Sequence, residues 1–498
     1  MKDALTQTLL ARVYDVAIES PLELARHMSA EINNNVYLKR EDLQPVHSFK
    51  LRGAYNKIAH LSAKQRAKGV IAASAGNHAQ GVALSAQRLG IKAVIVMPKT
   101  TPQIKTDAVV SYGAKVVLYG DNYSEAYDHC QTLIKETGME FVHPFDDPLV
   151  IAGQGTIGRE IIEQQPDVTH IFIPVGGGGL LGGVAQYVKQ LRPDIKIIGV
   201  EPDDSNAMQA SLKAGKRISL AHVGIFADGV AVKEVGKYTF ELAKKYADEI
   251  ITVNNDQLCA AIKTVFEETR TIAEPAGALA LAGAKAYAKT HKLTDKHLVA
   301  ICSGANMTFE KLQFIAERTL LGSGNEALFA VKLAEQPGAL QRFVNDVVNG
   351  HSITEFSYRL HDREQAHIFV GITVNGQADK TQFTKKMAQQ DYKYTDLTDD
   401  ETAKEHIRHM IGGPSSQTRH EHVYQINFPE RPGALSVFLR AIGARWNICL
   451  FHYRGQGGDT GKVLIGFETT DKSALEAGLS KVGYEFEAIN SKAIDIFL

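Results

Sequence analysis

The sequence predicts an open α/β fold with a parallel sheet over residues 1–320, followed by two small β-α-β-β-α-β modules. Two observations carry this prediction. Short, unbroken apolar runs rich in β-branched residues alternate with helical stretches in the first 320 residues, and the tail repeats itself at a shift of 95 residues. With 498 residues the chain is also too long for a single core, so two or three domains are expected.

The apolar runs of the first 320 residues suit strands that are buried on both faces, as in a parallel sheet. They cover residues 69–73, 93–97, 115–118, 171–175, 197–200 and 298–302. The segments 79–89 and 181–191 between them have helical spacing. Ligands of such folds gather beyond the carboxyl ends of the strands, so the functional residues are expected there.

The tail is predicted to hold two copies of one module, 327–398 and 420–491, after a breaker-rich linker at 321–325. The repeated segments are 335–340 with 430–435, 356–359 with 451–454, and 370–372 with 465–467. In the first copy, strands are predicted near 327–333, 352–360, 366–374 and 392–397, and helices near 337–349 and 380–390. This order is the split, ferredoxin-like arrangement.

Composition excludes several classes of function. Lys and Arg (55) balance Asp and Glu (56), so charge gives no reason to expect nucleic acid or an anionic membrane as partner. No apolar run approaches the roughly 18 residues of a membrane span, and the first residues lack a signal-peptide core. The four cysteines are far apart, which is typical of a reduced cytoplasmic protein. No metal site is expected, because histidine pairs such as His406 and His409 suit surface positions.

The first candidate for chemistry is Lys50, in the run Ser-Phe-Lys-Leu-Arg-Gly-Ala at 48–54. A partly desolvated lysine exposes a neutral amine, which can form an imine with an aldehyde cofactor. A lone lysine is more often a solvated helix residue, so the interpretation depends on its companions.

A second candidate is the turn made of Ser74, Ala75, Gly76, Asn77 and His78, directly after a predicted buried strand. A strand, a small-residue turn and a helix start gather backbone N–H groups, which suits an anion such as a substrate carboxylate. Asn77 can add a neutral hydrogen bond to a phenolic oxygen. The alternative is a simple helix cap, a common role of Ser and Asn.

A third candidate is the glycine run Gly176, Gly177, Gly178 and Gly179, followed by Leu180, between a strand and a helix. Four glycines let the backbone approach a ligand and offer several N–H donors to a phosphate. The run is neither a P-loop nor a dinucleotide fingerprint, so a nucleotide triphosphate is not expected. A flexible hinge is the alternative.

The fourth candidate is Ser303, in Cys-Ser-Gly-Ala-Asn at 302–306 after the last strand of the predicted parallel sheet. It is either a ligand contact or a capping serine. One ligand accounts for all four candidates: pyridoxal 5'-phosphate offers an aldehyde to Lys50, a phosphate to the glycine run, a phenolic oxygen to Asn77 and a ring nitrogen to Ser303. Phe49 then packs against the cofactor ring, or is an ordinary core residue.

These four motifs resemble the fold type II pyridoxal-phosphate family, whose catalytic domain is tryptophan synthase β-like, and within it most closely the threonine and serine dehydratases. The resemblance covers about residues 5–320. The paired tail resembles the ACT-like regulatory modules of the biosynthetic threonine dehydratases, so the likeness extends over nearly the whole chain.

The resemblance implies deamination of L-threonine, and more weakly of L-serine, by β-elimination, with 2-oxobutanoate and ammonia as the threonine products. It implies that Lys50 is both the cofactor anchor and the base that removes the α proton, and that Ser303 keeps the pyridine ring unprotonated. The first step of isoleucine biosynthesis is the implied place of the reaction. Serine dehydratase, serine racemase, a β-replacement enzyme and an inert amino-acid sensor are the alternatives.

The resemblance further implies inhibition by isoleucine, relief by valine and a homotetramer. Phe356, Tyr358, Phe451 and Tyr453 occupy equivalent places in the repeat and are the candidate effector contacts. Each could equally be a core aromatic of a strand.

Overall fold

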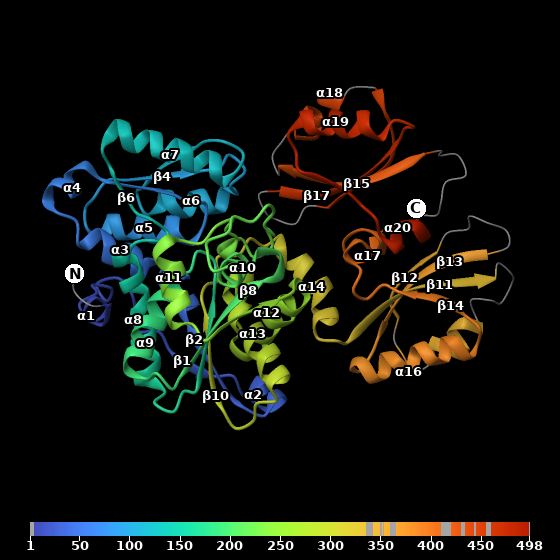
Figure 1. Cartoon of the computed structure of the whole chain (residues 1–498), viewed down its shortest axis with the longest axis horizontal. Coiled ribbons are helices and arrows are strands. Elements are labelled where there is room, and N and C mark those ends of the chain that lie inside the picture. Colours follow the sequence, from blue (N-terminus) through green and yellow to red (C-terminus); the bar gives the residue numbers. More distant parts are fainter. Residues whose placement is uncertain are drawn as a thin grey trace. The chain divides into compact units, whose positions relative to one another are not determined.

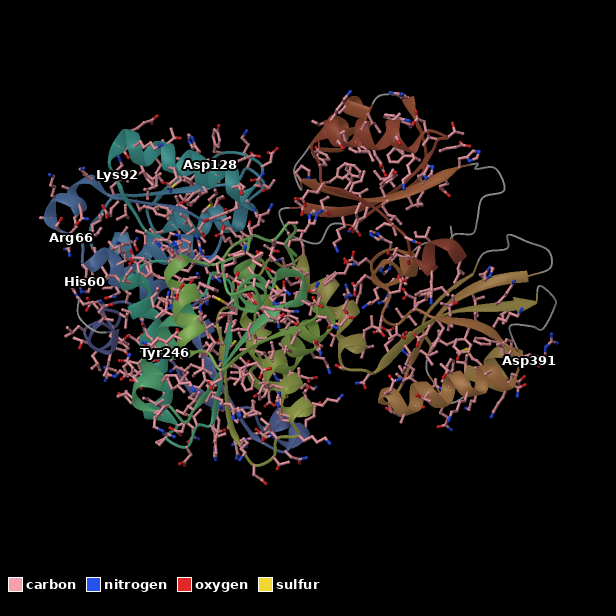
Figure 2. The ribbon with its side chains drawn as sticks, viewed as in Figure 1. His60, Arg66, Lys92, Asp128, Tyr246 and Asp391 are labelled. Carbon is pink, nitrogen blue, oxygen red and sulfur yellow. The ribbon has the colours of Figure 1, made fainter. Side chains whose placement is uncertain are left out.

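The computed structural model describes residues 4–334, 342–348, 351, 353–358, 365–409, 420–429, 434–442, 445–454 and 460–497. The chain forms two compact units, Met1–Phe309 and Glu310–Leu498 (Figure 1). Charged side chains such as Lys92 and Asp128 on the first unit and Asp391 on the second are exposed (Figure 2). Among the described residues, no helix combines the length and the apolar character that a membrane span requires.

The larger sheet of the first unit has six strands, and all but its first edge strand run parallel. Their order across the sheet is β1 (Leu22–Leu24), β2 (Asn35–Arg40), β10 (His297–Cys302), β7 (His170–Pro174), β8 (Lys196–Pro202) and β9 (Glu249–Val253). β1 pairs antiparallel with β2. The strands β7 and β10 are almost wholly buried, which explains their unbroken apolar sequence.

The smaller sheet has four parallel strands. Their order is β5 (Lys115–Leu118), β4 (Ala93–Met97), β3 (Val70–Ala73) and β6 (Glu140–Phe141). Every residue of β3 and β4 is buried, and apolar clusters lie on both faces of this sheet. The strands that the sequence predicts near 69–73, 93–97 and 115–118 are therefore confirmed.

Helices cover both sheets of the first unit. They are α1 (Ala4–Leu9), α2 (Arg26–Ile32), α3 (Lys50–Ala59), α4 (Ala63–Lys68), α5 (Asn77–Arg88), α6 (Gln103–Ser111), α7 (Tyr123–Thr137), α8 (Pro148–Gln164), α9 (Gly179–Leu191), α10 (Ala207–Ala214), α11 (Lys237–Tyr246), α12 (Asn255–Thr269) and α13 (Pro275–His291), with short 3-10 turns η1 (Glu41–Leu43), η2 (Asp203–Ser205) and η3 (Asp228–Val230). The helices α8, α9 and α11 lie on one side of the six-stranded sheet, and α12 and α13 lie on the other (Figure 1). The helices predicted at 79–89 and 181–191 correspond to α5 and α9.

The second unit contains two four-stranded antiparallel sheets with the same strand order. The first module has β11 (Glu326–Ala334), a π-helical turn η4 (Val344–Val348), β12 (Ile353–Tyr358), β13 (Gln365–Thr373), α16 (Gly376–Gln389) and β14 (Lys393–Asp396), in the sheet order β12-β13-β11-β14. The second has β15 (Glu421–Pro429), α18 (Ala434–Ile442), β16 (Asn447–Arg454), β17 (Thr460–Glu468), α19 (Lys472–Val482) and β18 (Phe486–Ala488), in the order β16-β17-β15-β18. The predicted pair of ferredoxin-like modules is thereby confirmed.

Three further helical elements and the C-terminal helix belong to this unit: α14 (Lys311–Gly322), α17 (Glu401–Glu405), η5 (Ile407–His409) and α20 (Lys492–Phe497). They contribute to one apolar cluster with the first module's sheet, in which Leu321 of α14 is buried. The stretch 321–325, predicted as a linker, therefore begins inside α14. The helix predicted at 380–390 begins four residues earlier than expected, at Gly376. The repeated motif at 335–340 and residues 430–433 of its second copy lie outside the described residues.

Candidate active site

The site lies where β3, β7 and β10 end and α3 begins. Two backbone links join the lysine segment to the serine segment, which lies far along the chain. The N–H of Phe49 donates to the carbonyl of Ser303 at 3.2 Å, and Ser48 forms an isolated bridge with Gly304. The side chain of Asn306 then donates to Oδ1 of Asn77 at 2.7 Å. Three of the four sequence motifs are thus in direct contact.

Lys50 is the first residue of α3 and is half-buried. Its Nζ donates to the carbonyl of Pro144 at 3.0 Å. Burial lowers the pKa of Lys50 to about 8, with the charge of Glu274 opposing the shift, so the neutral amine is accessible near neutral pH. The helices α3 and α8 approach closely because Gly53 and Gly153 have no side chains. A Cβ on either glycine would lie 2.7 Å from a backbone atom of the other helix.

The turn 74–78 connects β3 to α5, as the sequence predicts. The N–H of Ser74 donates to Val96 across the sheet at 3.1 Å, and the N–H of Gly76 donates to the Ser74 hydroxyl at 3.3 Å. Ala75 is half-buried in the same turn. His78 is buried and its Nε2 contacts the carbonyl of Val142 at 2.8 Å. Burial, with help from the Lys50 charge, lowers the pKa of His78 to about 3, so this histidine is neutral.

Ser303 directly follows β10 and is buried, and its hydroxyl donates to the carbonyl of Ala276 in the first turn of α13 at 3.1 Å. The hydroxyl of the neighbouring Ser48 is buried without a hydrogen-bond partner. Phe49 is buried as well, with its ring 5.3 Å from Nζ of Lys50. An aromatic ring therefore lies beside the lysine amine, and the same segment carries a buried hydroxyl.

The glycine run forms the turn between β7 and α9, and the structure gives each glycine a packing reason. A Cβ on Gly177 would lie 2.3 Å from the ring of Phe145, and Gly178 has a φ of +91°. Cβ atoms on Gly176 and Gly179 would lie 2.9 and 3.0 Å from backbone atoms of other segments. The helix α9 begins at Gly179, so its first N–H group belongs to the glycine run. No side chain caps this helix start, which leaves N–H groups there to bind an anion. Leu180 is buried in the core beneath.

Two parts of the site escaped the sequence analysis. Glu274 is buried at the start of α13, where its Oε1 accepts from Nδ2 of Asn77 at 2.5 Å. Its only local signal is Glu-Pro before a helix, which is typical of an ordinary helix start. The other is the segment Val142–Asp147 between β6 and α8, which contains the carbonyl facing Lys50 and the ring facing Gly177.

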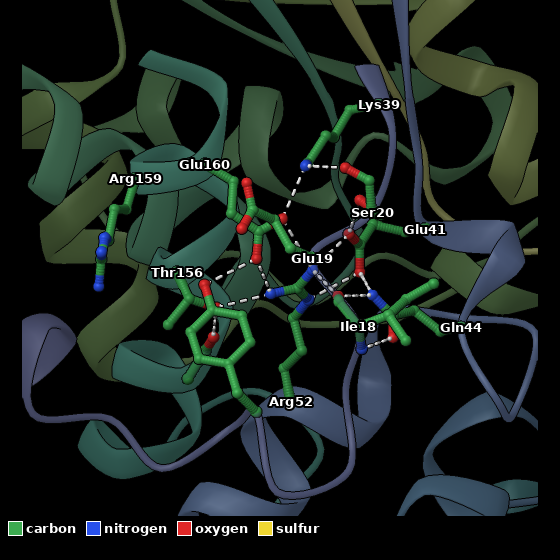
Figure 3. A network of polar contacts seen from close by, with 12 residues as sticks. Ile18, Glu19, Ser20, Lys39, Glu41, Gln44, Arg52, Thr156, Arg159 and Glu160 are labelled. Atoms are coloured by element: carbon green, nitrogen blue, oxygen red, sulfur yellow. Dashed lines mark hydrogen bonds and ion pairs between the residues drawn. The ribbon is translucent and has the colours of Figure 1, made fainter. Parts of the chain in front are cut away.

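A buried network of charges surrounds Arg52 of α3 (Figure 3). The guanidinium of Arg52 pairs with Glu41 at 2.7 Å and with Glu160 at 2.5 Å, and Lys39 pairs with Glu160 at 2.6 Å. All four side chains are at most 1% exposed, and two cations balance two anions. The Tyr14 hydroxyl also donates to Glu160. The network ties α3 to α8, to η1 and to the N-terminal segment.

The four candidate effector aromatics lie in edge strands of the two modules. Phe356 is paired with Val370 and Tyr358 with Ile368 in the first module, and Phe451 is paired with Ile465 and Tyr453 with Val463 in the second. Their backbone positions are therefore equivalent, as the repeat implies; their side chains lie outside the described set. Within the described ranges, no group of three or more His, Cys, Asp or Glu residues is placed to hold a metal ion.

Comparison with known proteins gives matches to both units of the chain. Residues 13–304 match the model of the pyridoxal-phosphate dependent enzymes, and residues 317–407 and 412–495 match that of the C-terminal regulatory domain of threonine dehydratase. The L-threonine dehydratase biosynthetic IlvA of Burkholderia multivorans is 52% identical over 503 residues, which covers 100% of this chain and 99% of the relative.

Two further relatives extend the comparison to plants. The chloroplastic biosynthetic threonine dehydratase of Arabidopsis thaliana is 50% identical, over 95% of this chain and 80% of the relative. The solved structure of the processed form of threonine deaminase isoform 2 from Solanum lycopersicum is 54% identical and covers 63% of this chain and 92% of that one, with a TM-score of 0.63.

Proposed function

This chain belongs to the pyridoxal-phosphate-dependent enzymes, among the biosynthetic threonine dehydratases with a regulatory domain, and we propose that Lys50 is the residue that holds its cofactor. The observation that carries the proposal is the Lys50 amine itself. It lies half-buried with a lowered pKa, at the point where the other motif segments meet. A lysine with these properties is an imine-forming nucleophile.

The surrounding residues fit the remaining groups of pyridoxal phosphate. The glycine run 176–179 with Leu180 opens α9 with uncapped N–H groups, which suits the phosphate. Asn77 lies beside Glu274 and Asn306, where its amide can meet the phenolic oxygen, and Phe49 can stack on the ring. The Ser303 hydroxyl, which donates to the Ala276 carbonyl in this structure, can face the ring nitrogen.

The turn of Ser74, Ala75, Gly76, Asn77 and His78 is proposed to bind the substrate carboxylate. Because the N–H of Ser74 is already used in the sheet, its hydroxyl is the group it can offer. His78 presents no positive charge there, since burial keeps it neutral. The carboxylate is then held by N–H groups and the start of α5.

The reaction that these residues support is loss of water and then ammonia from L-threonine. When bound, pyridoxal phosphate supplies an electron sink for the pair left by the α proton. Lys50 would hold the cofactor and, with its lowered pKa, could accept that proton as a neutral amine. Departure of the β hydroxyl as water, followed by hydrolysis, gives 2-oxobutanoate and ammonia. Ser303, a neutral partner for the ring nitrogen, favours prompt elimination over slower side reactions. L-serine is the proposed weaker substrate.

The tail is proposed to regulate this reaction in a cytoplasmic homotetramer. Modules 327–398 and 420–491 would bind isoleucine, which inhibits the catalytic domain formed by residues 1–320, and valine, which relieves the inhibition. The regulatory-domain match at 317–407 and 412–495 supports this assignment. Phe356, Tyr358, Phe451 and Tyr453, at equivalent backbone positions in the two edge strands, are the proposed effector contacts.

One assay tests both halves of the proposal. Keto acid released from L-threonine by the purified holoenzyme is measured with and without isoleucine, and with isoleucine plus valine. Activity that isoleucine suppresses and valine restores is the expected result. Activity indifferent to isoleucine would refute the regulatory half alone. Conversion of L-threonine to D-allothreonine in place of keto acid would refute the elimination chemistry.

A further inference from the structure

The segment Val142–Asp147 joins the lysine to the glycine run, although it carries no functional motif. The carbonyl of Pro144 accepts from Nζ of Lys50 at 3.0 Å. The next residue, Phe145, places its ring where a Cβ of Gly177 would otherwise lie, and its Cα and Cβ atoms lie against Gly179. Two consecutive residues of this segment therefore meet both proposed ends of the cofactor.

Asp146 reaches the glycine run by a second route. Its carboxylate accepts from the N–H groups of Lys237, Tyr238 and Thr239, the first three residues of α11, at 2.9, 2.8 and 3.2 Å. The hydroxyl of Thr239 in turn donates to the carbonyl of Gly177 at 2.6 Å. An acidic side chain at this helix start is favourable, so Asp146 fixes α11 where α11 holds the glycine run.

Asp147 closes the segment on the lysine side. One of its oxygens accepts from the N–H groups of Leu149 and Val150 and caps α8, and the other pairs with Lys57 of α3 at 2.7 Å. The segment is thus tied through Asp147 to the helix that begins with Lys50, and through Asp146 to the helix beside the glycine run.

The conformation of the segment depends on His143. Its Nδ1 accepts from the backbone N–H of Phe145 at 3.2 Å and from that of Asp146 at 2.8 Å. Because both donors are backbone amides, Nδ1 carries no proton and the ring is neutral, with its proton on Nε2. The ring also meets the ring of Phe145 edge-on, with centroids 4.7 Å apart. Burial lowers the pKa of His143, consistent with a neutral ring.

We propose that His143 is a positioning residue, whose neutral Nδ1 closes the turn that aims the Pro144 carbonyl at Lys50 and sets the Phe145 ring against the glycine run. The inference rests on the proposed roles of Lys50 and of residues 176–180. The sequence carries no signal for this role, and the hydrogen bonds of His143 come from the backbone of Phe145 and Asp146. It acts through the two residues that follow it.

The test compares two substitutions that both remove the imidazole. In His143→Asn, the side-chain carbonyl can accept from N–H groups two and three residues ahead, as asparagine does in turns. In His143→Leu no acceptor remains. The dissociation constant for pyridoxal phosphate is measured by titrating each apoenzyme and following the visible absorbance band, and kcat and KM for threonine are measured on the holoenzymes. His129→Leu, at a histidine stacked on Tyr119, serves as the matched control.

The expected result is a rise of about tenfold or more in the dissociation constant for His143→Leu, with a fall in kcat, because small displacements of reacting groups are costly. His143→Asn should stay within a few-fold of the wild type. Equal loss in both variants, or no loss in His143→Leu, would overturn the proposal. A purely structural role predicts equal loss, because both variants lose the ring packing.

A second measurement needs no variant and decides the matter if His143→Leu does not fold. In the wild-type holoenzyme labelled with nitrogen-15 on histidine, the His143 resonances should show an unprotonated Nδ1 at neutral pH. A protonated Nδ1 would overturn the proposal. If Lys50→Ala kept the visible band, the proposed function itself would fail; loss of the band in Lys50→Ala with unchanged binding in His143→Leu would refute only the role of His143.

Discussion

The N–H of Phe49 donates to the carbonyl of Ser303 at 3.2 Å, which places the residue before the lysine against the residue that follows β10. The adjoining bridge between Ser48 and Gly304 extends this contact. Lys50 and the hydroxyl of Ser303 are therefore held on paired backbone segments. Any shift of β10 at its end would move the lysine with it.

Arg52→Met should strongly destabilise the protein. The substitution leaves Glu41 and Glu160 without their guanidinium partner in a site that water does not reach, and removing one partner of a buried pair typically costs about 3–5 kcal/mol. Urea denaturation followed by circular dichroism measures the loss in free energy of unfolding. Arg159→Met is the control, because Arg159 forms only an exposed pair with Glu163 and should change the free energy by less than about 1 kcal/mol. Similar losses in the two variants would contradict the account of the buried network.

Gly177→Ala should weaken cofactor binding by about tenfold or more, because the new methyl group would displace the ring of Phe145 or the glycine run. Titration of the apoenzyme with pyridoxal phosphate measures the effect. In the double variant Gly177→Ala with Phe145→Ala, the ring is absent and binding should recover to some extent. If the double variant binds no better than Gly177→Ala alone, the clash with Phe145 is not the cause.

The fold and the general position of the site could be predicted from the sequence, because both depend on local patterns. The strand 171–175 is an unbroken apolar run and corresponds to β7, and the turns at Asn77 and Gly179 open the helices that follow buried strands. Helix boundaries were less predictable. The apolar positions of α16 begin after its first turn, so the sequence placed its start at 380 in place of Gly376.

The remaining features of the site depend on contacts between distant segments. Pro144 meets Lys50 across 94 residues of chain, and Asn77 meets Glu274 across 197. β6 has only two residues and gives no periodic pattern, so nothing marks the segment after it as functional. The one local signal there is Asp-Asp-Pro before α8, which predicts a helix cap and is indeed one.

Acid should destabilise the protein partly through His78. Its pKa in the folded state is lowered to about 3, below the ordinary value of 6.5, so between these values the unfolded chain binds a proton that the folded chain does not. The contribution of the neutral ring to the free energy of unfolding is therefore fully present above pH 6.5. It falls as the pH drops toward 3, by up to about 1.4 kcal/mol per pH unit. His78→Gln removes this contribution, so the free energy of unfolding, measured in urea at several pH values, should fall less steeply with acid. An unchanged slope would show that His78 is not a source of the acid sensitivity.

Ser303→Asp should change the fate of the reaction more than the binding of cofactor. A carboxylate at this position would favour a protonated ring nitrogen, which makes the bound cofactor a stronger electron sink and gives competing proton transfers more time. We expect more conversion of the cofactor to its amine form for each keto acid released, measured from absorbance spectra during turnover. Ser303→Ala, which adds no charge, should not raise this ratio. A ratio that rises equally in both variants would contradict the proposed role of the hydroxyl.

The central claim, that Lys50 holds the cofactor, is tested most directly by borohydride reduction of the purified holoenzyme followed by peptide mass spectrometry. The account predicts one modified lysine, Lys50, carrying the reduced pyridoxyl group. It also predicts that Lys50→Ala loses both the adduct and the visible band, while Lys64→Ala, at an exposed lysine of α4, keeps them. An adduct on another lysine, or one formed at the wild-type level in Lys50→Ala, would contradict the claim.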